Sequence, residues 1–218
     1  MEQGVYPKIK FCGLTDPADA ERAVALGAWA LGMIMWRPSP RCCPLEVAVE
    51  ITATFRRRAE MVGVFVNAPL PEITRVADAA SLSMIQLHGD EGPAFCAEAA
   101  RRTGCRVIKA ARIRSRADIQ ALNAFHTDFH MLDSYVAGVP GGTGETFAWD
   151  LARAHGERIP VVLSGGLDAD NVGEAIATVR PYAVDVASGV EISPGRKDPD
   201  KLEAFAAAVA SSTAVSTP

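Results

Sequence analysis

The sequence predicts an α/β protein that forms a single (β/α)₈ TIM barrel, and three observations lead to this fold class. Short apolar runs rich in β-branched residues alternate with longer segments whose apolar residues recur at helical spacing. Eight such units follow one another at roughly 25-residue intervals, which requires parallel strands because hairpins need far shorter connections. Hydrophobic residues make up 49% of the chain and aromatic residues only 6%, which suits the branched aliphatic core of a barrel.

The eight expected strands are short runs in which Val, Ile, Leu and Met predominate. They cover residues 8–12, 30–35, 61–66, 84–87, 106–110, 129–132, 160–163 and 182–186.

The segments between the strands carry the signals of amphipathic helices. Asp16 and Asp198 each stand before a proline, which places a capping carboxylate ahead of the first helical position. Gly27 and Gly104 stand where helices are expected to stop. Apolar residues recur at i, i+3, i+4 and i+7 in the segments 20–27, 73–80, 172–179 and 202–209.

Eight units in 218 residues favour one closed barrel, at the compact end of the usual size for this fold. The alternative, a doubly wound sheet, uses similar units but normally has fewer strands in this length. No Gly-, Ser- or Pro-rich linker marks a boundary, so we expect one domain over residues 1–210. The small, polar segment 211–218 is expected to be a disordered tail.

Charge and cysteine content restrict the partners and the compartment. The net charge is −4 and both signs are mixed along the chain, which argues against nucleic acid and against an acidic membrane surface as partners. Five cysteines are an odd number, and no apolar run approaches 18 residues. We therefore expect a reduced cytoplasmic protein. The sequence leaves open whether the chain is a monomer or a homodimer.

The sequence gives little support to a metal or a nucleotide cofactor. His126 and His130 straddle the expected start of a strand, and Cys42-Cys43 lacks zinc-type spacing. The glycines near residue 142 follow the sixth strand rather than the first and do not complete a dinucleotide fingerprint. We expect neither a metal nor a cofactor.

In a (β/α)₈ barrel the active face is built from the carboxyl ends of the strands and the loops that follow them. Reading only those positions gives a short set of candidate residues. They are Cys12, Arg41, Gln86, His88, Asp133, Gly142, Gly165, Gly166, Asp185, Ser188 and Gly189.

Three of these turns contain glycine beside an expected helix start and would expose backbone N–H groups. They contain Gly142, Gly165-Gly166 and Ser188-Gly189. The loops after strands 7 and 8 are the usual phosphate site of this fold, so we expect a phosphorylated small molecule as substrate. The alternative is that the glycines serve only as tight-turn residues.

The other candidates also have plain structural interpretations. Cys12 could be a small buried thiol of the core. Asp133 could cap a helix or accept a loop hydrogen bond, and His88 could support other residues rather than react. Arg41 could be a surface arginine that pairs with a nearby glutamate.

Six motifs, in this order and at this spacing over residues 8–208, resemble the phosphoribosylanthranilate isomerase family. Each motif alone is modest, but the ordered set is specific. The motifs are Lys-Phe-Cys-Gly-Leu-Thr at 10–15, Val-Gly-Val-Phe-Val-Asn at 62–67, Gln-Leu-His-Gly at 86–89, Gly-Gly-Thr-Gly at 141–144, Leu-Ser-Gly-Gly-Leu at 163–167 and Val-Asp-Val-Ala-Ser-Gly-Val-Glu at 184–191.

The resemblance implies an Amadori rearrangement of N-(5-phosphoribosyl)anthranilate in tryptophan biosynthesis. It assigns Cys12 as the general base, Asp133 as the general acid, and Arg41 as the partner of the anthranilate carboxylate. It also places substrate binding at Gln86, His88 and Asp185 and phosphate binding at the three glycine turns. One acid and one base on separate strands are the groups that this chemistry requires.

Two other functions remain open at this stage. A related isomerase of histidine biosynthesis performs the same rearrangement on a larger substrate, but it uses an aspartate on strand 1 where this chain has Cys12. A catalytically silent barrel that senses a phosphorylated metabolite would be expected to lack the acid or the base, and this chain has both.

Overall fold

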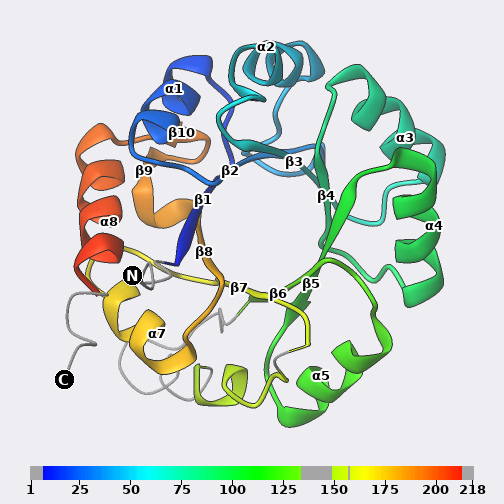
Figure 1. Cartoon of the computed structure of the whole chain (residues 1–218). Coiled ribbons are helices and arrows are strands. Elements are labelled where there is room, and N and C mark those ends of the chain that lie inside the picture. Colours follow the sequence, from blue (N-terminus) through cyan, green and yellow to red (C-terminus); the bar gives the residue numbers. More distant parts are fainter. Residues whose placement is uncertain (1–6, 134–148, 157, 213–218) are drawn as a thin grey trace.

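A computed structural model describes residues 7–133, 149–156 and 158–212. Eight parallel strands close into a barrel in the order β1 to β8, and Figure 1 shows helices surrounding it. The predicted fold class is therefore confirmed. The closing contact joins β1 to β8, with Lys10 opposite Asp185.

All eight predicted strands are present, with ends that differ by at most two residues. The largest difference is in β5, which continues to Arg112 because Ala111 and Arg112 still pair with Leu132 and Asp133 of β6. The strands are β1 Lys8–Cys12, β2 Ala30–Ile34, β3 Glu60–Phe65, β4 Met84–Leu87, β5 Arg106–Arg112, β6 Phe129–Asp133, β7 Val161–Ser164 and β8 Ala183–Val186.

Helices follow the strands, and the predicted apolar stripes at 20–27, 73–80, 172–179 and 202–209 coincide with α1, α3, α7 and α8. Residues 149–152 are also helical. The helices are α1 Pro17–Ala25, α2 Leu45–Phe55, α3 Leu70–Ala79, α4 Pro93–Thr103, α5 Arg116–Ala121, α7 Val172–Val179 and α8 Pro199–Ser212, with short 3₁₀ turns η1 Leu122–Ala124 and η2 Ser188–Val190.

The helix ends follow the sequence signals. The Asp16 carboxylate accepts a hydrogen bond from the Ala18 backbone N–H at 2.8 Å, as expected of an N-cap. Gly104 ends α4 in the left-handed conformation with φ 67°. Helix α8 continues to Ser212, two residues into the segment expected to be disordered, and residues 213–218 lie outside the described ranges.

Alternation along the strands creates two apolar layers. Val62, Val64 and Ile108 belong to the layer inside the barrel, whereas Phe11 and Ile85 belong to the layer between barrel and helices. Because successive side chains of a strand point to opposite faces, polar residues that alternate with the outer layer must point inward. The inward polar residues include Lys10, Gln86, Asp133, Ser164 and Asp185.

An additional antiparallel hairpin lies between η2 and α8, and the sequence did not predict it. It consists of β9 Glu191–Ser193 and β10 Arg196–Lys197, with Gly195 in the turn at φ 83°. Figure 1 shows it outside the barrel, close to α1 and α8. The Lys197 backbone N–H donates to the Asp19 carboxylate of α1 at 3.0 Å, which fixes the hairpin to that helix.

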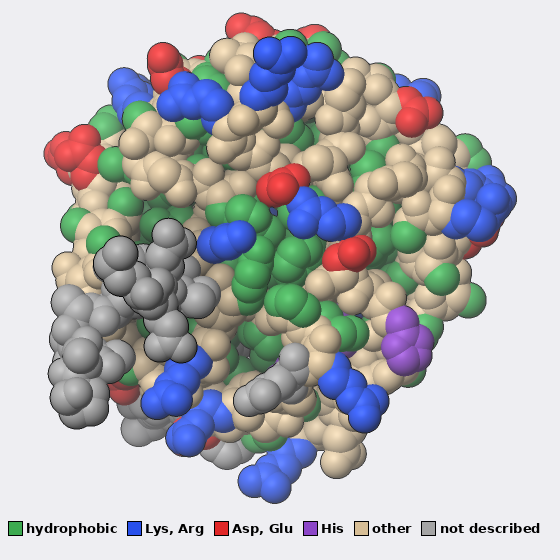
Figure 2. All heavy atoms as spheres, in the orientation of Figure 1, with side chains coloured by type: hydrophobic (Ala, Val, Ile, Leu, Met, Phe, Trp, Pro, Cys, Tyr) green, Lys and Arg blue, Asp and Glu red, His purple; other side chains and the backbone are tan. Residues whose placement is uncertain are grey.

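The molecular surface agrees with the mixed charge of the sequence. Figure 2 shows hydrophobic side chains over the middle of one face, with Lys, Arg, Asp and Glu side chains intermixed around them. Among the described helices, none is long and apolar enough to span a bilayer.

Candidate active site

The structure brings the predicted site residues of the described ranges to the carboxyl end of the barrel. The turn at Gly142 lies outside the described residues. Cys12, Gln86, Asp133 and Asp185 lie on β1, β4, β6 and β8. The others lie in loops or turns that follow strands, with Arg41 after β2, His88 after β4, Gly165 and Gly166 after β7, and Ser188 and Gly189 in η2 after β8.

Cys12 lies beside a buried ion pair. Lys10 Nζ is 2.6 Å from Asp185 Oδ1, and the Ser164 hydroxyl donates to the other carboxylate oxygen at 3.1 Å. Gly32 of β2 makes room for this group, because a Cβ there would lie 2.7 Å from the Cys12 sulfur and 3.0 Å from Lys10 Nζ. The thiol and the ammonium group are therefore neighbours in the barrel interior.

Burial and charge oppose each other at the thiol. Burial raises the pKa of Cys12 above its ordinary value, and the nearby Asp185 carboxylate adds to this, whereas the positive charge of Lys10 lowers it. Burial also lowers the pKa of Lys10, but the charges of Asp185 and Cys12 outweigh it and the net shift is upward. Lys10 is therefore a cation at neutral pH and favours the thiolate form of Cys12.

Asp133 is connected to β4 through a histidine. Asp133 Oδ2 lies 3.5 Å from His88 Nε2, and His88 Nδ1 lies 2.8 Å from Gln86 Nε2. Gln86 is buried, and its Oε1 has no hydrogen-bond partner within the described part of the chain. A buried acceptor in this state is suited to a donor group of a bound ligand.

Arg41 makes a pair with a glutamate, as the plain interpretation of this residue expects, but the pair is not a surface feature. Its Nε lies 2.9 Å from both carboxylate oxygens of Glu191, and its Nη2 lies 2.7 Å from Oε2. The side chains are 23% and 4% exposed. Lys197 Nζ reaches the same carboxylate at 3.1 Å. Glu191 and Lys197 were not among the site residues predicted from the sequence.

The glycine turns after β7 and β8 are in contact. Gly165 and Gly166 adopt left-handed φ values of 101° and 69°, which disfavour residues with a Cβ. A Cβ at Gly189 would collide with the carbonyl oxygen of Leu167, which follows that pair. The two turns therefore form one continuous backbone surface at the mouth of the barrel.

A second buried ion pair supports the turn that follows His88. The Glu91 carboxylate accepts backbone N–H groups of Asn67 and Gly89, both at 2.8 Å, and lies 2.9 Å from Lys109 Nζ. Lys109 also donates to the Gly89 carbonyl at 2.7 Å. Glu91 and Lys109 were not among the predicted site residues, although Gly89-Asp90-Glu91 after a strand is a polar turn that indicates such a contact.

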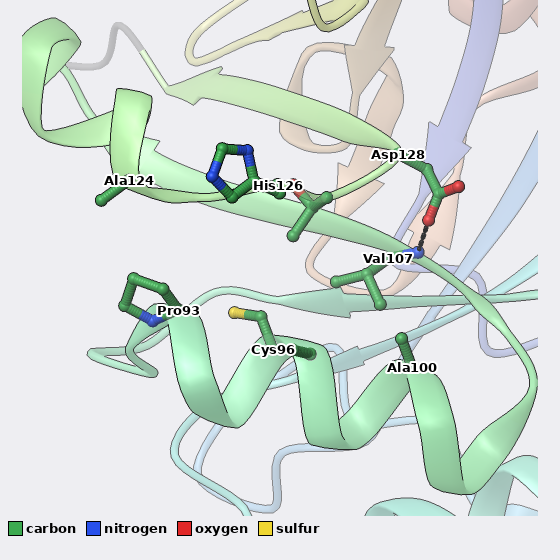
Figure 3. A pocket seen from close by; sticks show the side chains of 9 residues that line it. Pro93, Cys96, Ala100, Val107, Ala124, His126 and Asp128 are labelled. Atoms are coloured by element: carbon green, nitrogen blue, oxygen red, sulfur yellow. Dashed lines mark hydrogen bonds between the residues drawn. The ribbon is translucent and has the colours of Figure 1, made fainter.

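The cavity drawn in Figure 3 lies elsewhere. Pro93, Cys96 and Ala100 of α4 form one side, and Val107 near the start of β5 forms another. The Asp128 carboxylate, just before β6, accepts a hydrogen bond from the Val107 N–H at 2.8 Å. The cavity is thus at the opposite end of β6 from Asp133. The described residues contain no cluster of three His, Cys, Asp or Glu side chains arranged to hold a metal ion.

A closed (β/α)₈ barrel with reactive side chains and glycine turns gathered at the carboxyl ends of its strands has the architecture of a barrel enzyme. The sequence model of N-(5'-phosphoribosyl)anthranilate isomerase matches residues 9–208. The chain belongs to this family of phosphoribosylanthranilate isomerases. Its members act in tryptophan biosynthesis, so the chain is an isomerase that converts phosphoribosylanthranilate by an Amadori rearrangement.

Individual relatives agree with the family model. The N-(5'-phosphoribosyl)anthranilate isomerase of Citrifermentans bemidjiense is 47% identical over 195 residues, which are 89% of this chain and 93% of the relative. The crystal structure of the Thermotoga maritima enzyme matches with a TM-score of 0.86 at 38% identity, covering 94% of this chain and 99% of the other. A structure of a phosphoribosylanthranilate isomerase in complex with reduced 1-(o-carboxyphenylamino)-1-deoxyribulose 5-phosphate matches at 0.82 and 36%, with the same coverage.

Proposed function

We propose that Cys12 is the general base and Asp133 the general acid of the isomerisation of N-(5-phosphoribosyl)anthranilate. Asp133 gives its proton to the ring oxygen while the bond from that oxygen to C1′ breaks, and the nitrogen lone pair forms an iminium with C1′. The Cys12 thiolate then removes the C2′ proton, and the released electron pair forms the enolamine. Loss of the C2′ hydroxyl proton and protonation of C1′ give the ketone product.

The position of the two groups supports this division of labour. Cys12 ends β1 and Asp133 ends β6, with β7 and β8 between them in the barrel, and both side chains point inward. An acid and a base on separated strands can act on different atoms of one substrate lying across the mouth.

The surroundings of Cys12 supply the charge that a thiolate needs. Lys10 is buried within reach of the thiol, and the positive charge of Lys197 makes a smaller contribution that also lowers the pKa of Cys12. Both offset the burial that disfavours the thiolate. The observation that carries the proposal is this inward thiol beside a buried lysine, with the Asp133 carboxyl group on β6.

The substrate has two anionic ends, and separate groups are available for them. We assign the anthranilate carboxylate to Arg41, whose planar guanidinium suits a carboxylate. We assign the phosphate to the turns at Gly165-Gly166 and Ser188-Gly189, with Gly142 as a third contributor. A related isomerase has been crystallised with reduced 1-(o-carboxyphenylamino)-1-deoxyribulose 5-phosphate, a ligand that carries both a carboxylate and a phosphate.

Three further residues have supporting roles in the proposed site. Gln86 Oε1, which has no hydrogen-bond partner among the described residues, can accept a substrate hydroxyl, and His88 holds Asp133 in orientation. Asp185 acts indirectly, because its ion pair with Lys10 holds that lysine next to Cys12. None of these roles requires a metal or a redox cofactor, because both steps are proton transfers.

The rival assignments make different predictions. An isomerase of the histidine pathway would use an aspartate on strand 1, where this chain has Cys12, and a silent sensor would bind the substrate without converting it. The fall in phosphoribosylanthranilate fluorescence on adding the purified protein separates these cases. A protein that binds the compound without loss of its fluorescence would contradict an enzymatic role.

The division between acid and base is tested with substrate deuterated at C2′. The wild-type protein should show a primary isotope effect and release the deuterium to water. Cys12→Ala should retain the deuterium, because ring opening can occur without removal of the C2′ proton. Deuterium release at the wild-type rate by Cys12→Ala would assign the base to another group.

We also propose a cytoplasmic location, which the five free cysteines and the biosynthetic family support. The sequence leaves both a monomer and a homodimer open, and analytical ultracentrifugation of the purified protein distinguishes them.

A further inference from the structure

The β9–β10 hairpin brings a buried carboxylate to the arginine of the proposed site. The Glu191 side chain is 4% exposed, and its carboxylate accepts hydrogen bonds from Arg41 Nε and Nη2. It also accepts hydrogen bonds from Lys197 Nζ at 3.1 Å and from the Gly195 N–H at 3.3 Å. Burial raises the pKa of Glu191, but the Arg41 hydrogen bonds and the Lys197 charge outweigh it, so the net shift is downward. The carboxylate is therefore ionised at neutral pH.

These contacts fix the orientation of the guanidinium. Glu191 takes the edge formed by Nε and Nη2 in a bidentate contact. Within the described residues, Nη1 has no hydrogen-bond partner, so this part of the fork remains available to a ligand. The aliphatic stem of Arg41 packs on Gly13, where a Cβ would lie 3.0 Å from the arginine Cδ. The arginine is thus held against the turn that follows Cys12.

The same network reaches the proposed phosphate turn. Lys197 is almost wholly buried, and its Nζ donates to the Ala187 carbonyl at 3.0 Å, one residue before Ser188. The backbone of the hairpin is tied to α8, because Lys201 Nζ donates to the Glu191 carbonyl at 2.9 Å. One buried carboxylate therefore connects the loop after β2 with the loop after β8.

We infer that Glu191 is a positioning residue that sets the angle of Arg41 toward the carboxylate end of the substrate, with Lys197 fixing Glu191 in turn. The inference rests on the proposed function, in which Arg41 binds the anthranilate carboxylate. A solely structural ion pair would hold the hairpin in place and leave substrate affinity unchanged. The two roles differ in how the effects of substituting Glu191 and Arg41 on KM combine.

The test is Glu191→Gln, which keeps the shape of the side chain and removes its charge. We expect KM for phosphoribosylanthranilate to rise by about tenfold or more, the size expected from losing one charge-assisted hydrogen bond, with kcat changed by less than about threefold. Benzoate, which carries only the carboxylate, should lose inhibitory strength to a similar extent. Inorganic phosphate should lose less of its inhibitory strength than benzoate does.

Arg41→Ala provides the background that separates positioning from structure. If Glu191 acts through Arg41, adding Glu191→Gln to Arg41→Ala should cause no further rise in KM, whereas a structural role predicts that the two effects multiply. Glu60→Gln is the matched control, because Glu60 pairs with Arg106 at 2.6 Å at the amino end of the barrel. This control should leave KM unchanged.

Circular dichroism and urea unfolding establish that each variant is folded. If Glu191→Gln does not fold, Glu191→Asp keeps the charge on a shorter side chain and should raise KM by a smaller factor. An unchanged KM in a folded Glu191 variant, or multiplicative effects with Arg41→Ala, would overturn the inference while leaving the enzymatic role intact. Failure of the wild-type protein to convert the substrate would instead remove the proposed function.

Discussion

Lys10 Nζ and Asp185 Oδ1 lie 2.6 Å apart inside the barrel, where their side chains are 0% and 6% exposed. The pair joins β1 to β8 at the position where the barrel closes. An ion pair in this environment is rarely retained for stability alone, because the cost of removing two charges from water offsets their attraction. In the proposed mechanism, this pair holds the positive charge of Lys10 beside Cys12.

Replacing Lys10 should therefore affect both stability and the thiol. Lys10→Met leaves Asp185 buried without its cation, which typically costs about 3–5 kcal/mol of unfolding free energy. It should also slow alkylation of Cys12 by iodoacetamide, because the pKa of the thiol rises further. Urea unfolding and the alkylation rate measure the two effects. The double variant Lys10→Met/Asp185→Leu should recover much of the stability but not the reactivity.

A histidine pair on the outside of β6 predicts acid sensitivity. His130 Nδ1 lies 2.8 Å from His155 Nε2, and the Phe125 carbonyl lies 3.1 Å from His130 Nε2. Burial, followed by the charges of His155 and His126, lowers the pKa of His130 to about 4, and burial lowers that of His155 as well. Both side chains are therefore neutral in the folded protein at pH 7.

The unfolded chain binds a proton at His130 near pH 6.5, whereas the folded protein does so only near pH 4. The free energy of unfolding should therefore fall as the pH is lowered from about 6.5 to 4, by up to roughly 3 kcal/mol for this residue at 1.36 kcal/mol per pKa unit. Urea unfolding across this range measures the slope. In His130→Gln the slope should be smaller, and an equal slope would assign it to other groups.

The strands and four helices were predictable because they depend on local patterns of apolar residues and on capping signals such as Asp16. The positions of Cys12 and Asp133 followed from the rule that strand ends meet at one face of a barrel. In contrast, Glu191 pairs with Arg41 across 150 positions of sequence, and no local pattern encodes such a contact. The hairpin that carries Glu191 has strands of three and two residues, too short for alternation to reveal.

The role of the glycine turns can be tested at Gly189. Gly189→Ala would push a Cβ into the Leu167 carbonyl, so the turn must shift and its N–H groups would leave their positions. We expect a higher KM and weaker inhibition by inorganic phosphate, with a smaller change in kcat. Gly173→Ala in α7 is the matched control, because a Cβ there meets no atom within 4 Å. Equal phosphate inhibition in both variants would argue against a phosphate site at this turn.

Arg41→Lys separates the geometry of the arginine from its charge. A lysine ammonium cannot form the bidentate contact with Glu191 and still present a donor pair to a carboxylate. The loss of one such bond, about 1.5–3 kcal/mol, corresponds to a fall in kcat/KM of about tenfold or more. Arg101→Lys is the control, because Arg101 also donates hydrogen bonds from Nε and Nη2 to a glutamate, Glu98, but is exposed on α4. The measurement is kcat/KM for both variants, which should fall in Arg41→Lys and stay unchanged in Arg101→Lys. A wild-type kcat/KM in Arg41→Lys would restrict Arg41 to a structural role.

The proton transfers make the strongest demand on the site, and Cys12→Ala and Asp133→Asn test them. General acid or base catalysis contributes about 10²–10⁴-fold, so each variant should lose at least about 10²-fold in the rate of single-turnover conversion. Cys12 is 5% exposed and packs within the inner layer, so alanine removes little more than the sulfur and should keep the fold.

The two variants should differ in which step fails. Asp133→Asn retains a side chain of the same shape beside His88 but has no acidic proton to give to the ring oxygen. Ring opening should therefore stop, whereas Cys12→Ala should stop after ring opening because the C2′ proton remains. Affinity for the product should be nearly unchanged in both, since neither group is assigned to an anionic end of the ligand. A variant that keeps near wild-type single-turnover rates would exclude that residue from its role, and His88 or Asp185 would then be the next group to replace.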